Sequence, residues 1–321
     1  MLKTIKQLAL ISRAEFLLPN LGSLIMGLAW GANPSIDLAE LVILVGLSFT
    51  IINLSSAIGA QANTISDYEL DLRDSRKKEL VQALDSFGQN RLKKVMIAEF
   101  AGTFALIVAF ILVKTNPGLP LMWIIGISLG CLYSAPPLRI KSKSWLAPMT
   151  LILVLGIFPV LFAYFTFTSE LKAAFLLALA GLALTVYGVI IPTEIRDYFG
   201  DKEMGIETMT VRLGLVNASL LSMMLLSIGG TLMGIAFFNT LAQGKHPLLS
   251  LLLIAVAIAD LIVLRKFKKL YALSNEYENS NGAKSIEQEI TDFSANNQKW
   301  IMLVTQTYSA LSIIMLVNKF S

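Results

Sequence analysis

The sequence has few of the residues that commonly form zinc sites and disulfides. Its 321 residues include one cysteine, Cys131, and one histidine, His246. One cysteine excludes a disulfide within the chain, and a zinc site normally needs several cysteine or histidine ligands. Any bound metal is therefore expected to have oxygen ligands, which favours magnesium or calcium.

Charge is also scarce. Charged residues make up 15% of the chain and hydrophobic residues 55%, whereas soluble domains average about 25% charged residues. Apolar windows of about 20 residues, the length that a membrane-spanning helix requires, recur from one end to the other. The sequence therefore predicts an all-α polytopic membrane protein with a single membrane-embedded domain over residues 1–321.

Nine transmembrane helices bundled around a central cavity are expected. A polar cytoplasmic segment, residues 265–299, would precede the last of them. The predicted ranges are Phe16–Trp30, Leu41–Gln61, Val95–Val113, Leu121–Ser134, Trp145–Phe167, Leu171–Thr193, Val216–Thr240, Pro247–Leu264 and Trp300–Val317.

The distribution of lysine and arginine predicts the orientation of these helices. With nine spans, 22 of the 26 basic residues fall at the N-terminus or in the loops on its side of the membrane. The positive-inside rule places that side in the cytoplasm. We therefore expect a cytoplasmic N-terminus, and most acidic residues lie on the same side.

Two clusters of acidic residues each continue an apolar helix on this side. In the first, Asn63, Asp67 and Asp71 have the spacing i, i+4, i+8. In the second, Glu194, Asp197 and Asp201 have the spacing i, i+3, i+7. Both spacings place the side chains along one face of a helix.

These clusters need a counter-charge near the membrane. An acidic side chain costs about 2.5–3.5 kcal/mol at the centre of a spanning helix, and like charges one turn apart repel. Acidic residues in cytoplasmic loops are often simply solvated, but two clusters at matching positions favour a shared role. Magnesium commonly binds one or two carboxylates together with phosphate oxygens. Opposed across a cavity, the two clusters would form a magnesium–diphosphate site.

Basic residues accompany both clusters at positions where a diphosphate would need them. Most cytoplasmic lysines and arginines act only as topology determinants. Arg139 and Lys141 are better candidates, because they follow the stiffening pair Pro136-Pro137. The candidates are Arg73, Arg76, Lys77 and Lys78 after the first cluster, Arg139 and Lys141 in the loop after the fourth helix, and Arg196 and Lys202 within the second cluster.

The two clusters resemble the motifs of the UbiA superfamily of intramembrane prenyltransferases. Asn63, Asp67 and Asp71 match its first motif, N-D-x-x-D-x-x-x-D, with Thr64 in place of an aspartate. The second cluster matches D-x-x-D-x-x-x-D, with Glu194 in place of its first aspartate. The segment Gly205–Gly214 also resembles the family, and the predicted helices would cover the whole chain.

The resemblance implies a magnesium-dependent prenyltransferase. Two ions held by both motifs would bind an isoprenyl diphosphate, such as geranylgeranyl diphosphate, and Arg and Lys side chains would stabilise the departing diphosphate. Tyr68, Tyr133, Tyr187 and Tyr198 are candidates for contact with the allylic cation, although packing is the default role of each. The isoprenyl tail would lie in a tunnel between helices that opens to the membrane lipids. No nucleic-acid partner is expected.

The resemblance leaves the acceptor open. The segment Tyr133–Lys141 is similar to family branches that prenylate precursors of chlorophyll, menaquinone and tocopherol, and archaeal glycerol-lipid geranylgeranyl transferases share much of the same pattern. A terpene cyclase would use the same motifs without an acceptor. A transporter is a remote alternative, because both carboxylate clusters lie on one side of the membrane and Asp260 is the only ionisable residue expected near the middle of the bilayer.

Overall fold

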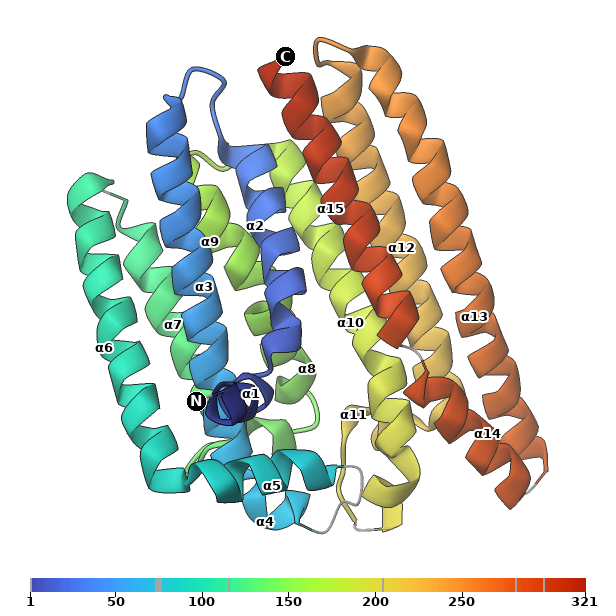
Figure 1. Cartoon of the computed structure of the whole chain (residues 1–321). Coiled ribbons are helices and arrows are strands. Elements are labelled where there is room, and N and C mark those ends of the chain that lie inside the picture. Colours follow the sequence, from blue (N-terminus) through green and yellow to red (C-terminus); the bar gives the residue numbers. More distant parts are fainter. Residues whose placement is uncertain (1, 73–76, 115, 204, 281, 297) are drawn as a thin grey trace. The chain divides into compact units, whose positions relative to one another are not determined.

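The computed structural model of the chain describes residues 2–72, 77–114, 116–203, 205–280, 282–296 and 298–321. All regular elements within these residues are helices (Figure 1), which confirms the predicted all-α class. Short 3-10 or π-helical elements are labelled η. In chain order the elements are α1 (Leu2–Ile11), η1 (Ala14–Phe16), α2 (Leu17–Gly31), α3 (Leu38–Ser66), α4 (Tyr68–Asp71), α5 (Lys78–Phe87), α6 (Gln89–Val113), α7 (Gly118–Ser134), η3 (Ile140–Ser142), α8 (Leu146–Leu151), η4 (Ile152–Ile157), α9 (Phe158–Phe167), α10 (Ala173–Glu203), α11 (Met209–Leu213), α12 (Leu215–Ala242), η5 (Pro247–Leu252), α13 (Leu253–Asn279), α14 (Lys284–Ala295) and α15 (Gln298–Phe320).

Within the described residues, six helical segments are long and apolar enough to cross a bilayer, so the chain is an integral membrane protein. The pair Lys3–Ile11 and Ala14–Gly31, bent by 68°, would make a seventh if it counts as one span. Each of the nine predicted ranges coincides with helix, but nine spans are not confirmed. The α7 helix has only 17 residues, and α15 is not among the six segments. The six segments are α3, α6, Leu146–Phe167, α10, α12 and Pro247–Asn279.

The chain divides by compactness into two units. The first contains Met1–Lys141 and Phe158–Ser169, and the second contains Ser142–Ile157 and Glu170–Ser321. The boundary runs through the helical segment Leu146–Phe167. A division of this kind does not test whether residues 1–321 form one domain, so the single domain stays a prediction.

In the first unit, small residues and a buried hydrogen bond join α2, α3 and α9. Gly27 of α2 lies so close to α9 that a Cβ atom there would be 2.4 Å from the Cβ atom of Ala163. Ser48 of α3 and Thr166 of α9 share a buried hydrogen bond of 2.9 Å. Small residues and interhelical hydrogen bonds of this kind associate helices in a bilayer, where lipid is as apolar as the side chains. The contacts at Gly27 and Ser48 therefore hold α2, α3 and α9 together, and the end of α3 carries the first acidic cluster.

In the second unit, α10 and α12 approach each other backbone to backbone. A Cβ atom at Gly229 would lie 2.5 Å from Thr185 Oγ1 and 2.7 Å from the carbonyl oxygen of Gly181. Glycine is therefore required at this crossing, and the close approach gives the two long helices their van der Waals contact.

A proline lies inside α10, two residues before the second acidic cluster. Pro192 has no N–H group to donate to the Gly188 carbonyl one turn earlier. The Ser222 hydroxyl of α12 donates to that carbonyl instead, at 2.6 Å. With this carbonyl satisfied, α10 continues through the proline to Glu203 and carries the whole second cluster.

The polar segment 265–299 is helical over most of its described length. The α13 helix continues to Asn279, and α14 follows after a short turn. Ile290 of α14 is fully buried in a cluster with Leu270 and Leu273 of α13 and Tyr198 of α10. The α14 helix therefore belongs to the packed core of the second unit.

The close approach of α10 and α12 leads to a stability prediction. Gly229→Ala should lower the free energy of unfolding by about 1–3 kcal/mol, because the new methyl group would meet backbone atoms that cannot move independently. Gly234→Ala on the same helix is the matched control, since nothing lies within 4 Å of its Cβ position. Thermal unfolding in detergent would measure both, and equal midpoints for the two variants would contradict the packing.

Candidate functional site

The first acidic cluster lies where α3 ends. The expected uninterrupted helix is not observed, because α3 stops at Ser66 and the four-residue α4 follows Asp67, whose φ is −100°. The i to i+4 spacing nevertheless survives in the backbone. The N–H of Asp67 donates to the Asn63 carbonyl at 2.9 Å, and the N–H of Asp71 donates to the Asp67 carbonyl at 2.8 Å. The three residues therefore follow one another at one-turn intervals.

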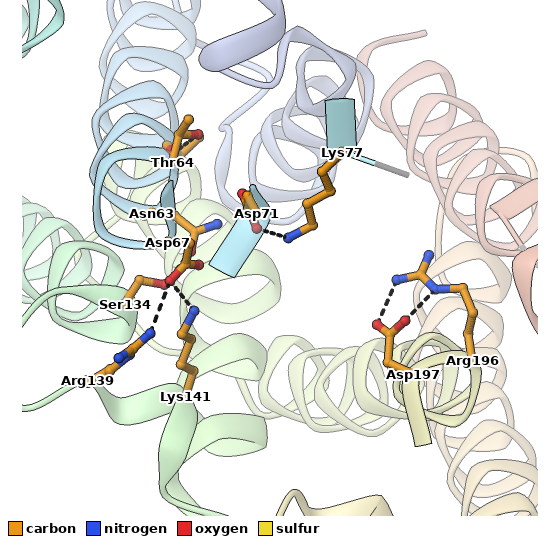
Figure 2. Close-up of polar contacts among 11 residues, drawn as sticks. Asn63, Thr64, Asp67, Asp71, Lys77, Ser134, Arg139, Lys141, Arg196 and Asp197 are labelled. Carbon is orange, nitrogen blue, oxygen red and sulfur yellow. Dashed lines mark hydrogen bonds and ion pairs between the residues drawn. The ribbon is translucent and has the colours of Figure 1, made fainter. Parts of the chain in front are cut away.

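Asp67 is buried, and two cations from one segment neutralise it. Asp67 is 5% exposed. Its Oδ1 atom forms ion pairs with Lys141 Nζ and, at 3.7 Å, with Arg139 Nη2. Figure 2 shows both side chains converging on Asp67. Arg139 has a φ of 40°, a left-handed conformation uncommon outside glycine. The structure thus brings the two favoured basic candidates to the first cluster.

The other members of this cluster also have polar partners. Asn63 Oδ1 accepts a hydrogen bond from Ser134 Oγ at the end of α7, and the preceding residue, Tyr133, is half-buried. Asp71 is 5% exposed and is paired with Lys77 at 2.6 Å. Lys78 is exposed. The remaining basic candidates here, Arg73 and Arg76, lie outside the described residues.

Tyr68, between Asp67 and Asp71, faces a different partner. Its hydroxyl donates to Asp85 Oδ1 of α5 at 2.7 Å, and this hydrogen bond is the main reason why the pKa of the Tyr68 phenol is raised. The contact joins α4 to α5. It does not involve Asp67 or Asp71, whose partners are the cations described above.

The second cluster lies on one uninterrupted helix, as its spacing predicts. Glu194 accepts a hydrogen bond of 2.6 Å from Thr210 Oγ1. Asp197 is held by two hydrogen bonds from the neighbouring Arg196, at 2.9 and 3.0 Å, also drawn in Figure 2. Asp201 is half-buried in the following turn. Lys202 lies 5.6 Å from the ring centre of Tyr198, so its ammonium group is oriented by the helix that carries the cluster.

Two partners in the site were not among the predicted residues. Ser134 and Thr210 bind Asn63 and Glu194, but neither has a position in a spacing pattern. For Thr210 a weak local signal exists, because Thr208 caps α11 through the N–H of Val211 and so starts the helix that presents Thr210. Ser134 has no capping signal, but like Thr210 it lies in a segment that resembles the family, Tyr133–Lys141 for Ser134 and Gly205–Gly214 for Thr210.

Thr64, at the position where the family motif has an aspartate, is packed against backbone. It is 3% exposed, and its hydroxyl donates to the carbonyls of Ala60 at 3.0 Å and Ile11 at 3.5 Å. The neighbouring Gln61 donates to Ser12 Oγ at 2.8 Å. These contacts fasten α3 to the end of α1, so position 64 has a structural role in this chain.

The donor atoms of both clusters suit a hard divalent cation. Among the described residues, no three His, Cys, Asp or Glu side chains are gathered into one metal-binding group. Each cluster nevertheless offers carboxylate oxygens, and Asn63 adds an amide oxygen. Magnesium takes one or two carboxylates and completes its shell with water and phosphate oxygens. The residues present therefore fit magnesium, while lysines and arginines supply the counter-charge in the ion pairs described above.

Comparison with protein-family models matches residues 20–273 to the model described as the UbiA prenyltransferase family. The matched range contains both acidic clusters and most of the chain. None of the curated proteins compared matches the chain.

Solved structures with a similar fold cover nearly the whole chain. A structure of digeranylgeranylglyceryl phosphate synthase is 17% identical, with a TM-score of 0.66, and the alignment covers 98% of this chain and 100% of that one. A UbiA homologue from Archaeoglobus fulgidus bound to GPP and Mg²⁺ is 18% identical, with a TM-score of 0.61 and coverages of 93% and 99%. The apo structure of a UbiA homologue from Aeropyrum pernix K1 is 16% identical, with a TM-score of 0.64 and coverages of 95% and 98%. At these identities the similarity shows a shared fold.

The packing of Thr64 leads to a prediction that separates a ligand from a structural position. Thr64→Asp should lower the free energy of unfolding by about 1–3 kcal/mol, because it places a carboxylate beside two carbonyl oxygens and removes their donor. Thr64→Ser keeps the hydroxyl and should unfold near the wild-type temperature. Thermal unfolding in detergent without magnesium makes the comparison. A normal midpoint for Thr64→Asp, with stronger stabilisation by magnesium, would instead make position 64 a metal ligand.

Proposed function

The chain belongs to the UbiA prenyltransferase family, and we propose that it uses magnesium to transfer an isoprenyl group from an isoprenyl diphosphate to a hydrophobic or amphiphilic acceptor. The family establishes the enzyme class, a membrane prenyltransferase. The observation that best supports the diphosphate is the first cluster, where the buried Asp67 and Asp71 lie beside Lys141 and Lys77. Archaeoglobus fulgidus homologues of the same fold bind GPP or DMAPP together with Mg²⁺.

Both clusters would supply the metal ligands. Asn63, Asp67 and Asp71 would contribute from the first cluster, and the remaining ligands would be Glu194, Asp197 and Asp201 from the second. Two bound ions would offset the negative charge that develops on the departing diphosphate. The Thr210 hydroxyl orients the Glu194 carboxylate through its hydrogen bond, which reduces the freedom that a long side chain would lose on binding.

The cations that neutralise Asp67 also suit the diphosphate. Arginine offers a planar fork of donors to phosphate oxygens, and lysine offers a compact charge. Contacts from Arg139 and Lys141 strengthen as charge builds on the leaving group, so they should raise kcat more than they lower KM. A charge-assisted hydrogen bond contributes about 1.5–3 kcal/mol, which corresponds to about ten- to 150-fold in rate. The more peripheral substrate contacts would come from Lys77, Lys78, Tyr133, Arg196 and Lys202.

The orientation of the chain follows from its basic residues. Both clusters lie on the side that is rich in lysine and arginine, which the positive-inside rule assigns to the cytoplasm. The diphosphate would then enter from the cytoplasm, while its apolar tail stays in contact with the helices and lipid.

Incubation with geranylgeranyl diphosphate and magnesium, over a panel of acceptors, tests the proposed function. The panel would contain a quinone precursor, a tetrapyrrole and a glycerol-based lipid, and products would be identified by mass spectrometry. A prenylated acceptor with released diphosphate supports the transferase. A cyclic hydrocarbon formed without acceptor would identify a terpene cyclase, and no diphosphate release with any isoprenyl chain length would refute the proposal.

In the same assay, variants of the two clusters should lose turnover while keeping the fold. Asp67→Asn and Asp201→Asn each preserve side-chain shape but remove the charge that a metal ion requires, and we expect a loss of at least about 100-fold. Glu69→Gln and Glu203→Gln are the controls, since both residues are exposed and lie close in sequence to their clusters without belonging to them. Near-normal turnover of either cluster variant at low magnesium would remove that residue from the site.

Replacement of Lys141 should have opposite effects on metal binding and on turnover. Lys141→Gln removes the cation that competes with magnesium for Asp67, so the magnesium concentration for half-maximal thermal stabilisation should fall. Turnover should fall as well, by about tenfold or more, because a charged contact to the leaving diphosphate is lost. Lys143→Gln, at an exposed position two residues away, should change neither value. A higher magnesium requirement for Lys141→Gln would show that the lysine does not compete for Asp67.

A further inference from the structure

The α13 helix crosses from an apolar to a basic sequence at Leu264. At about 2.0 Å per residue in η5 and 1.5 Å in α13, the apolar run Pro247–Leu264 is about 30 Å long. This length equals the hydrocarbon thickness of a bilayer, about 30 Å. The basic residues that begin at Arg265, including Lys266 and Lys269, therefore lie at the level of the lipid headgroups.

A wide-open pocket with several charged and polar side chains in its lining lies at this level between α13 and α14. The two helices lie side by side in the second unit (Figure 1), and the pocket between them has a volume of about 420 Å³. The pocket is lined by Lys266, Ser285, Gln288, Glu289, Asp292, Phe293 and Asn296.

The walls of the pocket carry opposite charges. Lys266 of α13 supplies the cation, whereas Glu289 and Asp292 of α14 supply two carboxylates. Glu289 is 3.3 Å from Lys269, and Asp292 accepts a hydrogen bond of 2.9 Å from Gln288. Because a carboxylate has about four acceptor positions, both retain capacity for a further donor. The hydroxyl of Ser285 and the amide of Asn296 add neutral donors and acceptors.

The pocket is built on a fixed pair of helices. Ile290, one residue after Glu289, is fully buried between α13 and α10. Lys269 lies 5.4 Å from the ring centre of Phe293, which adds a cation–π contact to its ion pair. The backbones of α13 and α14 are therefore held together by a packed core beside the pocket.

We infer that this pocket binds the zwitterionic headgroup of an aminophospholipid, with the phosphate at Lys266 and the primary ammonium at Glu289 and Asp292. A purely anionic headgroup would be repelled by the two carboxylates, and a purely cationic ligand would be repelled by Lys266. A primary ammonium can donate three hydrogen bonds to the carboxylates, whereas the trimethylated ammonium of phosphatidylcholine can donate none. A bound lipid would fasten α13 and α14 to the membrane on the side that carries the second acidic cluster.

Native mass spectrometry of the full-length protein in detergent tests this inference. The protein would be titrated with short-chain phosphatidylethanolamine, phosphatidylcholine and phosphatidylglycerol, and with soluble glycerophosphoethanolamine. We expect the dissociation constant of phosphatidylethanolamine to be at least about tenfold below that of the other two lipids. Glycerophosphoethanolamine should bind more weakly than the lipid, because it lacks acyl chains. Equal binding of all three lipids, or equal binding of the soluble headgroup, would overturn the inference.

Matched variants locate the binding site. Lys266→Gln and Asp292→Asn should each remove the preference for phosphatidylethanolamine. Lys268→Gln and Glu287→Gln, which alter the same two helices at residues outside the pocket lining, should retain it. Thermal unfolding of all four variants shows whether each is folded, and the wild-type lipid panel decides the question independently of any variant. Retention of the full preference by both pocket variants would place the lipid elsewhere.

Discussion

The buried carboxylate of Asp67 constrains how the first unit packs. Removing a charge from water costs several kcal/mol unless a partner of opposite charge lies beside it. The partners here are Lys141 and Arg139, so the segment after α7 must reach the end of α3. The packing of α7 on α3 makes this possible, since the two helices meet at Gly59 and Gly130, where a Cβ atom on Gly59 would be 3.7 Å from the Gly130 Cα atom.

The second unit satisfies the polar groups of its cluster in a different way. There the cluster is presented by a single long helix, and the helix depends on a neighbour because Pro192 leaves a carbonyl without its usual donor. Ser222 supplies that donor, and Thr210 binds Glu194. In both units, polar groups near the candidate site obtain partners from elements that are distant in sequence. A change in those partners would therefore disturb the site without touching a motif residue.

Much of the helical architecture could be predicted because membrane-spanning segments must satisfy their backbone groups internally. The nine predicted ranges all coincide with helix, yet the number of spans did not follow. Within the described residues six segments are long and apolar enough to cross a bilayer, and α7 has only 17 residues. Locally, the break at Asp67 was not predictable, because the i, i+4, i+8 spacing is equally compatible with one continuous helix. The role of Thr64 was also hidden, because it depends on the carbonyl of Ile11 in another helix.

The sequence by itself determined the membrane class, the helical ranges and the two acidic clusters. These properties are encoded locally, in apolar windows of about 20 residues and in spacings of one helical turn. Only the tertiary structure decided which cation neutralises which carboxylate. Lys141, which is 74 residues from Asp67, is its partner, while Lys78, much nearer in sequence, is exposed. The reason is physical: the partner of a buried charge is chosen by how helices pack and loops close, and neither leaves a periodic signal in the sequence.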